Sequence, residues 1–205
     1  TTIDPNYVRR CVELLEATGA DNVGGRMVGV GENDFARAVV LATSHPFGVG
    51  GARFHYSEKA ELVDTVYLGA WRRDLFPRMG LFDEELVRNQ DDELNYRLRD
   101  LGGRVLLSPE IKSEYVVRSR PRALISQYFQ YGYWKVRVMQ KHPRQMRVSH
   151  FVPSLFALAL GGLAATSPFS RTARRALPLL MGAYVGLTGV ATLSLSRRPG
   201  CGGGG

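Results

Sequence analysis

Residues 89–103 read Asn-Gln-Asp-Asp-Glu-Leu-Asn-Tyr-Arg-Leu-Arg-Asp-Leu-Gly-Gly. Three consecutive carboxylates open the stretch, and leucines then recur at positions i, i+4 and i+7, which is the spacing of one buried helix face. Acids in a first turn are favoured by the helix macrodipole, and a glycine pair is a common helix end. The stretch therefore predicts a capped helix with an acidic N-terminus, which by this pattern alone is either a surface helix or part of a site.

Other segments predict strands and helices around this acidic helix. Residues 64–70 are typical of a strand that ends in small residues, and residues 80–84 (Gly-Leu-Phe-Asp-Glu) predict a tight turn just before the acids. Further strands are expected over 22–30, 104–109 and 114–117, and a long helix is expected over 122–140. These elements describe a chain of the α/β class.

The segments 69–73, 80–84 and 90–98 together resemble the second half of a family 2 glycosyltransferase, of the succinoglycan or exopolysaccharide type. This resemblance covers roughly residues 3–150 and implies a partial, Rossmann-like GT-A fold. The family signature Glu-Asp-x-Asp-Leu-x-x-Arg-Leu carries the catalytic base on its first aspartate. That aspartate matches Asp91, while a glutamine stands where the family has its leading glutamate.

The resemblance implies an inverting transfer, in which an acceptor hydroxyl attacks a nucleotide-activated sugar and Asp91 takes the proton. A single displacement needs one carboxylate, unlike the pair used in glycoside hydrolysis. Asp92 is expected to point away and cap the helix. Glu93 and Arg97 match the second acid and the arginine of the signature, and their spacing predicts an ion pair that supports the first turn.

The same resemblance assigns residues to acceptor binding. Gly69 and Ala70 would line the acceptor site, where a larger side chain would block the incoming sugar. The aromatic-rich segment 127–135 matches part of the family's Gln-x-x-Arg-Trp element, which places Gln127 and Tyr131 beside the acceptor with the tyrosine stacked on a sugar face. Aromatic residues fall on all sides of this helix, so some must face a groove, a partner or lipid headgroups.

Charge is divided unevenly along the chain. Residues 1–114 contain 14 Lys and Arg against all 19 Asp and Glu, whereas residues 115–205 contain 13 basic residues and no acid. This asymmetry indicates an anionic partner for the second half, either a membrane surface or nucleic acid. Uncharged stretches over 151–170 and 176–196 are long enough to span a bilayer. A spanning hairpin, helices lying in the interface and a soluble buried pair remain open.

Three regions follow from these patterns: an acceptor-side half of a GT-A domain over 1–142, membrane-associated helices over 143–198, and a flexible glycine-rich tail over 199–205. The chain is expected to be a fragment, because no Asp-x-Asp strand or donor-binding half precedes residue 1. A divalent cation, Mg²⁺ or Mn²⁺, is therefore expected for the complete enzyme, with no metal ligand in this chain.

The expected partners are a nucleotide-sugar donor, a lipid-linked saccharide acceptor and the cytoplasmic face of the cell membrane. Two alternatives stay open, a non-catalytic membrane-bound fragment and a basic nucleic-acid-binding module, and the uncharged stretches argue against the second. Cys11 and Cys201 indicate neither a disulfide framework nor a metal site. His45 and His55 lack metal-ligand spacing and are expected at the surface.

Overall fold

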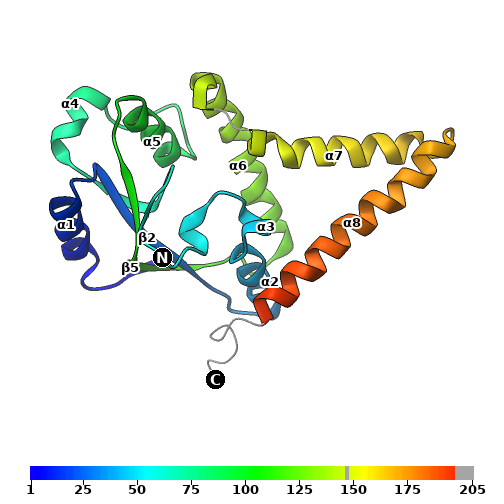
Figure 1. Cartoon of the computed structure of the whole chain (residues 1–205), viewed down its shortest axis with the longest axis horizontal. Coiled ribbons are helices and arrows are strands. Elements are labelled where there is room, and N and C mark those ends of the chain that lie inside the picture. The colour runs from blue at the N-terminus through cyan, green and yellow to red at the C-terminus, as the bar shows by residue number, and fades with distance from the viewer. Residues whose placement is uncertain (146–147, 197–205) are drawn as a thin grey trace. The chain divides into compact units, whose positions relative to one another are not determined.

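The computed structural model describes residues 1–145 and 148–196 (Figure 1). The chain divides into two compact units, Thr1–Gln145 and Met146–Gly205. The first unit is a mixed sheet with helices, which confirms the α/β class and is consistent with part of the GT-A fold that the resemblance implied. The tail expected over 199–205 lies outside the described residues, as do residues 197–198 of the expected membrane segment.

The sheet of the first unit has five strands among the described residues. They are β1 (Thr2–Ile3), β2 (Asn22–Val30), β3 (Glu61–Leu62), β4 (Tyr67–Trp71) and β5 (Val105–Val116). The strand order is β1-β5-β2-β4, and β3 also pairs with β5. β2 and β5 run parallel, while every other pairing is antiparallel.

Strand β5 corrects the expectation of two separate strands over 104–109 and 114–117. Against β2, Ser108 pairs with Gly25 and Lys112 pairs with Arg26, so the residues between them form a bulge without ending the strand. Pro109, which suggested a strand end, lies in this bulge, where no ladder donor is required. Gly25 makes the bulge possible, because a Cβ there would lie 2.0 Å from the carbonyl oxygen of Ile111.

Helices cover both faces of the sheet (Figure 1). The longer ones of this unit are α1 (Tyr7–Thr18), α2 (Asp34–Thr43), α5 (Gln90–Asp100) and α6 (Pro121–Lys141), and short ones are α3 (Pro46–Val49), α4 (Phe76–Met79), η1 (Arg53–His55), η2 (Arg73–Leu75) and η3 (Pro143–Gln145). One buried cluster joins α1 to the sheet through Tyr7, Cys11, Leu15, Ala20, Val23 and Ile111. A second joins α5 to the sheet through Val66, Met79, Leu94, Leu98, Val105 and Leu107.

The predicted acidic helix is present as α5. It begins after Asn89, whose φ is +60°, and the chain reverses after it at Gly102, whose φ is +80°. Leu94 and Leu98 are buried as expected, but Leu101 is 48% exposed. The helix ends one residue before Leu101, so the helical period no longer sets the direction of that side chain.

The described part of the second unit consists of α7 (Val148–Thr166) and α8 (Arg171–Ser196). Both helices are long and apolar enough to cross a membrane by length and composition, with a mean hydropathy of 1.6. The structure ends the first apolar helix at Thr166 and begins the second at Arg171, so the basic cluster between the expected segments lies in the first turns of α8. Whether the pair spans the bilayer or lies in its plane stays a prediction.

Candidate active site

The acidic end of α5 borders a cavity of about 230 Å³ inside the first unit. Side chains from β2, α2, η1, β4, α5, β5 and α6 line it. They are Met27, Gly29, Val39, Thr43, Phe54, His55, Tyr67, Asn89, Asp91, Asp92, Tyr115, Val117, Leu124, Gln127, Tyr128 and Tyr131. Apolar and aromatic walls with a few polar groups are typical of a small-molecule site. Of the expected site residues, Asp91, Asp92, Gln127 and Tyr131 meet here.

Asp91 is an acid of this cavity whose pKa is raised well above its ordinary value. Burial, and after it the neighbouring charge of Asp92, raise the pKa of its carboxyl to about 6. The backbone N–H groups of Asp92 and Asp91 and the ammonium of Lys135 act in the opposite direction. A carboxylate whose pKa lies near neutral pH is well matched to accept a proton from a bound hydroxyl.

Gln127 holds two tyrosines at the cavity wall. Its side-chain amide donates to the hydroxyl of Tyr115 at 2.8 Å and to the hydroxyl of Tyr131 at 2.9 Å. The side chain of Asn89 donates to the backbone carbonyl of Tyr131 at 3.1 Å, which ties the start of α5 to α6. Tyr128 adds an edge-to-face ring contact to Tyr131. The wall is thus an ordered set of aromatic faces joined by hydrogen bonds.

Asp92 does not cap the helix and point away, as the sequence suggested. It faces α6, where the ammonium of Lys135 lies 2.9 Å from its Oδ2. Lys135 also donates to the hydroxyl of Tyr96 at 2.9 Å and lies 5.1 Å from the centre of that ring. The partner that redirects Asp92 comes from 43 residues away, which no local pattern shows.

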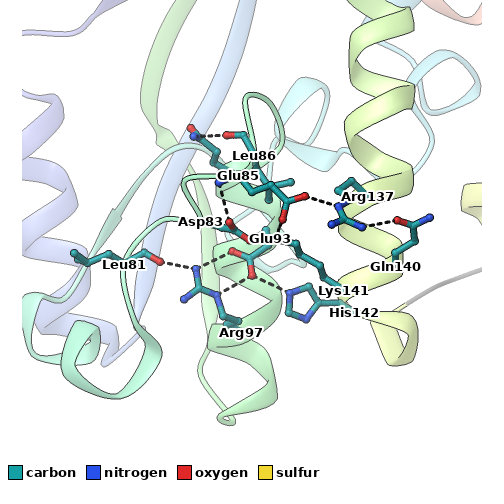
Figure 2. A network of polar contacts seen from close by, with 11 residues as sticks. Leu81, Asp83, Glu85, Leu86, Glu93, Arg97, Arg137, Gln140, Lys141 and His142 are labelled. Atoms are coloured by element: carbon teal, nitrogen blue, oxygen red, sulfur yellow. Dashed lines mark hydrogen bonds and ion pairs between the residues drawn. The ribbon is translucent and has the colours of Figure 1, made fainter.

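Glu93 and Arg97 form the ion pair that their spacing predicted, and Figure 2 shows them beside His142 at the end of α6. Arg97 contacts both oxygens of Glu93, at 2.8 and 2.7 Å, and the Nε2 of His142 lies 2.8 Å from Oε1. Arg97 also donates to the backbone carbonyls of Met79 and Leu81. The pair therefore does not line the cavity; it joins α5 to the preceding loop and to α6.

A second layer of ion pairs surrounds this buried group (Figure 2). Lys141 contacts Asp83 and Glu85, and Arg137 also contacts Glu85. The hydrogen bond from Lys141 lowers the pKa of Asp83, and the hydrogen bond from Arg137 lowers that of Glu85. The turn at 80–86 is thus attached to the C-terminal half of α6, which fixes the wall of the cavity that α6 forms.

The glutamine at position 90 has a structural use. Its side-chain amide donates to the backbone carbonyl of Leu86. An ionised glutamate cannot donate a hydrogen bond and would place a negative charge against that carbonyl. The departure from the family signature therefore fits the local turn.

Gly69 and Ala70 do not line the cavity in the described structure. A Cβ on Gly69 would lie 2.5 Å from Oδ1 of the buried Asn22, so the glycine is required by packing against that side chain. The Nδ2 of Asn22 donates to Asn95 at 2.7 Å, and Trp71 donates to the same oxygen at 3.2 Å. Roles for Gly69 and Ala70 in acceptor binding stay a prediction.

We expect Gly69→Ala to lower the free energy of unfolding by about 1–3 kcal/mol, because the added methyl group must displace the Asn22 amide from its buried hydrogen bond. Thermal or urea unfolding followed by circular dichroism measures the change. Gly51→Ala is the matched control, since nothing lies within 4 Å of a Cβ at that position. Equal stability of the two variants would contradict the packing explanation.

Several residues of the cavity were not predicted as site residues from the sequence. His55 was expected at the surface, but η1 turns its ring into the cavity beside Phe54, with ring centres 4.6 Å apart. Burial lowers the pKa of His55 to about 4, so its imidazole is neutral at physiological pH. Tyr67 and Tyr115 also meet at the wall, with an edge-to-face contact of 6.2 Å. These residues come from separate strands and turns, and only the fold brings them together.

A metal site does not form among residues 1–145 and 148–196. These residues contain no group of three or more His, Cys, Asp and Glu side chains placed to hold an ion. Asp91 and Asp92 are adjacent acids, but the carboxylate of Asp92 already forms an ion pair with Lys135. The residues present therefore do not fit the cation that the resemblance implies.

Comparison with known proteins finds relatives whose names place them in glycan synthesis. No protein-family model matches the chain. The succinoglycan biosynthesis protein ExoA of Rhizobium meliloti (strain 1021) is 30% identical over 165 residues, which cover 80% of this chain and 50% of that protein. The dolichyl N-acetyl-alpha-D-glucosaminyl phosphate 3-beta-D-2,3-diacetamido-2,3-dideoxy-beta-D-glucuronosyltransferase of Methanococcus voltae is 30% identical over 120 residues, which cover 58% of this chain and 37% of that protein. The chain thus spans half or less of the length of these relatives.

Proposed function

This chain is a homologue of the exopolysaccharide-type glycosyltransferases of family 2, and from that premise we propose that it forms the acceptor side of a sugar-transfer site. The complete protein that contains these residues would move a sugar from a nucleotide-sugar donor to a hydroxyl of a saccharide, in exopolysaccharide or cell-envelope glycan synthesis. The observation that carries the proposal is the carboxyl of Asp91, which lies in a tyrosine-walled cavity with its pKa raised to about 6.

The proposed reaction is a single displacement with inversion. The acceptor oxygen forms a bond to the anomeric carbon, and the bond from that carbon to the diphosphate oxygen breaks, with its electron pair leaving on the diphosphate. The hydroxyl proton passes to the carboxylate of Asp91, which must be ionised to receive it. Activity should therefore rise with pH as Asp91 deprotonates.

The wall formed by α6 would hold the acceptor. Sugar rings present C–H faces that pack on aromatic rings, and Tyr131 and Tyr128 offer such rings at the cavity. Gln127 keeps Tyr131 in place through its hydrogen bond. We assign acceptor binding to Gln127 and Tyr131 on this basis, while Gly69 and Ala70 are assigned to it by resemblance alone.

We place the donor-binding half and the ligands of a divalent cation, Mg²⁺ or Mn²⁺, outside residues 1–205. The greater length of both relatives supports this division. When bound, the cation would neutralise the departing diphosphate. This chain would contribute the base and the acceptor wall.

We further propose that the protein acts at the cytoplasmic face of the cell membrane on a lipid-linked acceptor. Two helices suited to a bilayer support membrane association, and the basic second half of the chain suits anionic lipid. The name of the Methanococcus voltae relative specifies a dolichyl sugar phosphate, which is a lipid-linked sugar.

The pH dependence of transfer tests this proposal through Lys135. The rate constant kcat/KM of the complete protein should fall on the acid side as Asp91 becomes protonated, near pH 6. Lys135→Met removes a cation that lowers the pKa of Asp91, so this acid limb should move to higher pH. Among the described residues that line the cavity with Asp91, burial lowers the pKa of His55 to about 4 and raises the pKa values of Tyr67 and Tyr128, so these three groups are neutral near pH 7.

Lys135→Arg is the matched control, because it keeps a cation opposite Asp92 and should leave the acid limb near its original place. Tyr96→Phe removes the other hydrogen bond of Lys135 without changing charge, and it should have a smaller effect. An acid limb that is the same in Lys135→Met and in the parent would contradict the assignment of that limb to Asp91.

A further inference from the structure

Helix α6 has two functional faces of opposite character. Gln127, Tyr131 and Lys135 recur every four residues and point to the cavity and to α5. Another set recurs at intervals of three or four residues on the other side. Its members are Ile125, Phe129, Tyr133 and Val136, which are 69%, 74%, 63% and 55% exposed. We refer to these four residues as the outer stripe.

The outer stripe is directed away from the cavity. At 100° per residue, the middle of the outer stripe lies about 150° around the helix from the middle of the cavity-facing set. The two sets are thus separated by little more than one helix diameter, about 10 Å. Whatever covers the outer stripe is therefore close to the place where Asp91 and the tyrosines meet.

An exposed apolar stripe on a helix requires a partner surface. The composition of the stripe, with two aromatic residues and two β-branched aliphatic residues, suits the boundary between lipid headgroups and acyl chains. The charge around it suits anionic lipid. Arg118, Arg120 and Arg122 are exposed at the N-terminal end of α6, and no acid occurs from residue 115 to the end of the chain.

The position of α6 in the chain supports the same partner. It ends at Lys141, and the apolar helix α7 begins at Val148, so few residues separate the stripe from a segment suited to the bilayer. We propose that α6 lies in the interface of an anionic membrane, with the outer stripe against lipid and its opposite face forming the acceptor wall. The cavity would then open within a helix diameter of the bilayer surface, where the sugar of a lipid-linked acceptor is presented.

This inference rests on the membrane association proposed above and not on sugar transfer. Environment-sensitive labels test the interfacial position of α6 separately from membrane association itself. Phe129→Cys in the full chain, combined with Cys201→Ser, would carry an NBD fluorophore, while the buried Cys11 is left in place. Val12→Cys on α1 is the matched control, an exposed apolar site, 46% accessible, away from α6. Leu158→Cys on α7 reports membrane association itself.

The labelled proteins are reconstituted in vesicles of phosphatidylcholine and phosphatidylglycerol that contain shallow doxyl-labelled lipids. We expect the Phe129 label to be blue-shifted and quenched severalfold more than the Val12 label, and the quenching to weaken when phosphatidylcholine replaces the anionic lipid. A Phe129 label that is blue-shifted but unquenched is covered by protein, either a second copy or another segment of this chain, and overturns the inference. Quenching at Leu158 without quenching at Phe129 overturns it while membrane association stands; absence of quenching at both sites overturns both proposals.

Discussion

Asp91→Asn should lower kcat of sugar transfer by the complete protein about 10²- to 10⁴-fold, which is the range for loss of a positioned general base. The substitution keeps the shape of the side chain in the cavity but removes its ability to accept a proton. KM for the acceptor should change little, because Gln127 and the tyrosines of α6 stay in place. Initial rates with a radiolabelled nucleotide-sugar measure both constants.

The stability of Asp91→Asn separates a catalytic role from a structural one. The pKa of Asp91 is higher in the folded protein than its ordinary value, so folding is favoured while the group is protonated. That contribution is complete at low pH and is lost as the pH rises through about 6. Replacing this half-buried carboxylate by a neutral amide should therefore leave Tm at pH 7 unchanged or raise it, while activity falls. A variant that loses both Tm and activity would show that Asp91 supports the fold instead.

Asp92→Asn is the matched control for this experiment. It lies next to Asp91 and in the same cavity, but its carboxylate is engaged by Lys135. We expect a loss of rate far smaller than that of Asp91→Asn, together with an acid limb moved by the loss of a neighbouring charge. If both variants lost activity equally, the assignment of the base to Asp91 alone would be wrong.

Arg97→Met should lower the free energy of unfolding by about 3–5 kcal/mol, which is the usual cost of removing one partner from a buried ion pair. The carboxylate of Glu93 is only 4% exposed, and loss of Arg97 leaves His142 as its remaining partner. The carbonyls of Met79 and Leu81 lose their donor in the same step. Urea unfolding of the first unit, followed by circular dichroism, measures the change.

Arg9→Met is the matched control for Arg97→Met. Arg9 and Glu13 form an ion pair with the same spacing of four residues, but their side chains are 65% and 50% exposed. Exposed pairs contribute about 0–1 kcal/mol, so this variant should unfold almost like the parent. Similar losses in the two variants would show that burial of Glu93 does not set the cost.

Much of the fold was accessible from local patterns. Helix α5 was predicted from its acids, leucines and glycines, and its ends are set by positive φ angles at Asn89 and Gly102. Strand β2 matches the predicted range 22–30. The continuity of β5 was missed, because Pro109 indicates a strand end unless the neighbouring strand is known to have a glycine, Gly25, opposite the bulge. Gly25 lies more than 80 residues before the bulge in the chain, so no local pattern shows it.

The residues of the candidate site also fall into those that a local pattern predicted and those that only the fold brings together. Asp91 was predicted as the base because it matches the first aspartate of the family signature, and the structure places it in the cavity. His55, Tyr67 and Tyr115 were missed because each lies in a different element and carries no spacing signal of its own. Asp92 was placed wrongly because its partner, Lys135, belongs to α6.

The sequence alone determined the acidic helix, the ion pair of Glu93 with Arg97 and the apolar character of the two C-terminal helices, because each depends on residues a few positions apart. The tertiary structure alone decided that Asp91 has a raised pKa and that Asp92 pairs with Lys135, because the groups around these acids come from α6 and from the strands. It also decided that one side of α6 faces the cavity while the other carries the outer stripe. A helical period shows that two faces exist, but only packing shows which of them is covered.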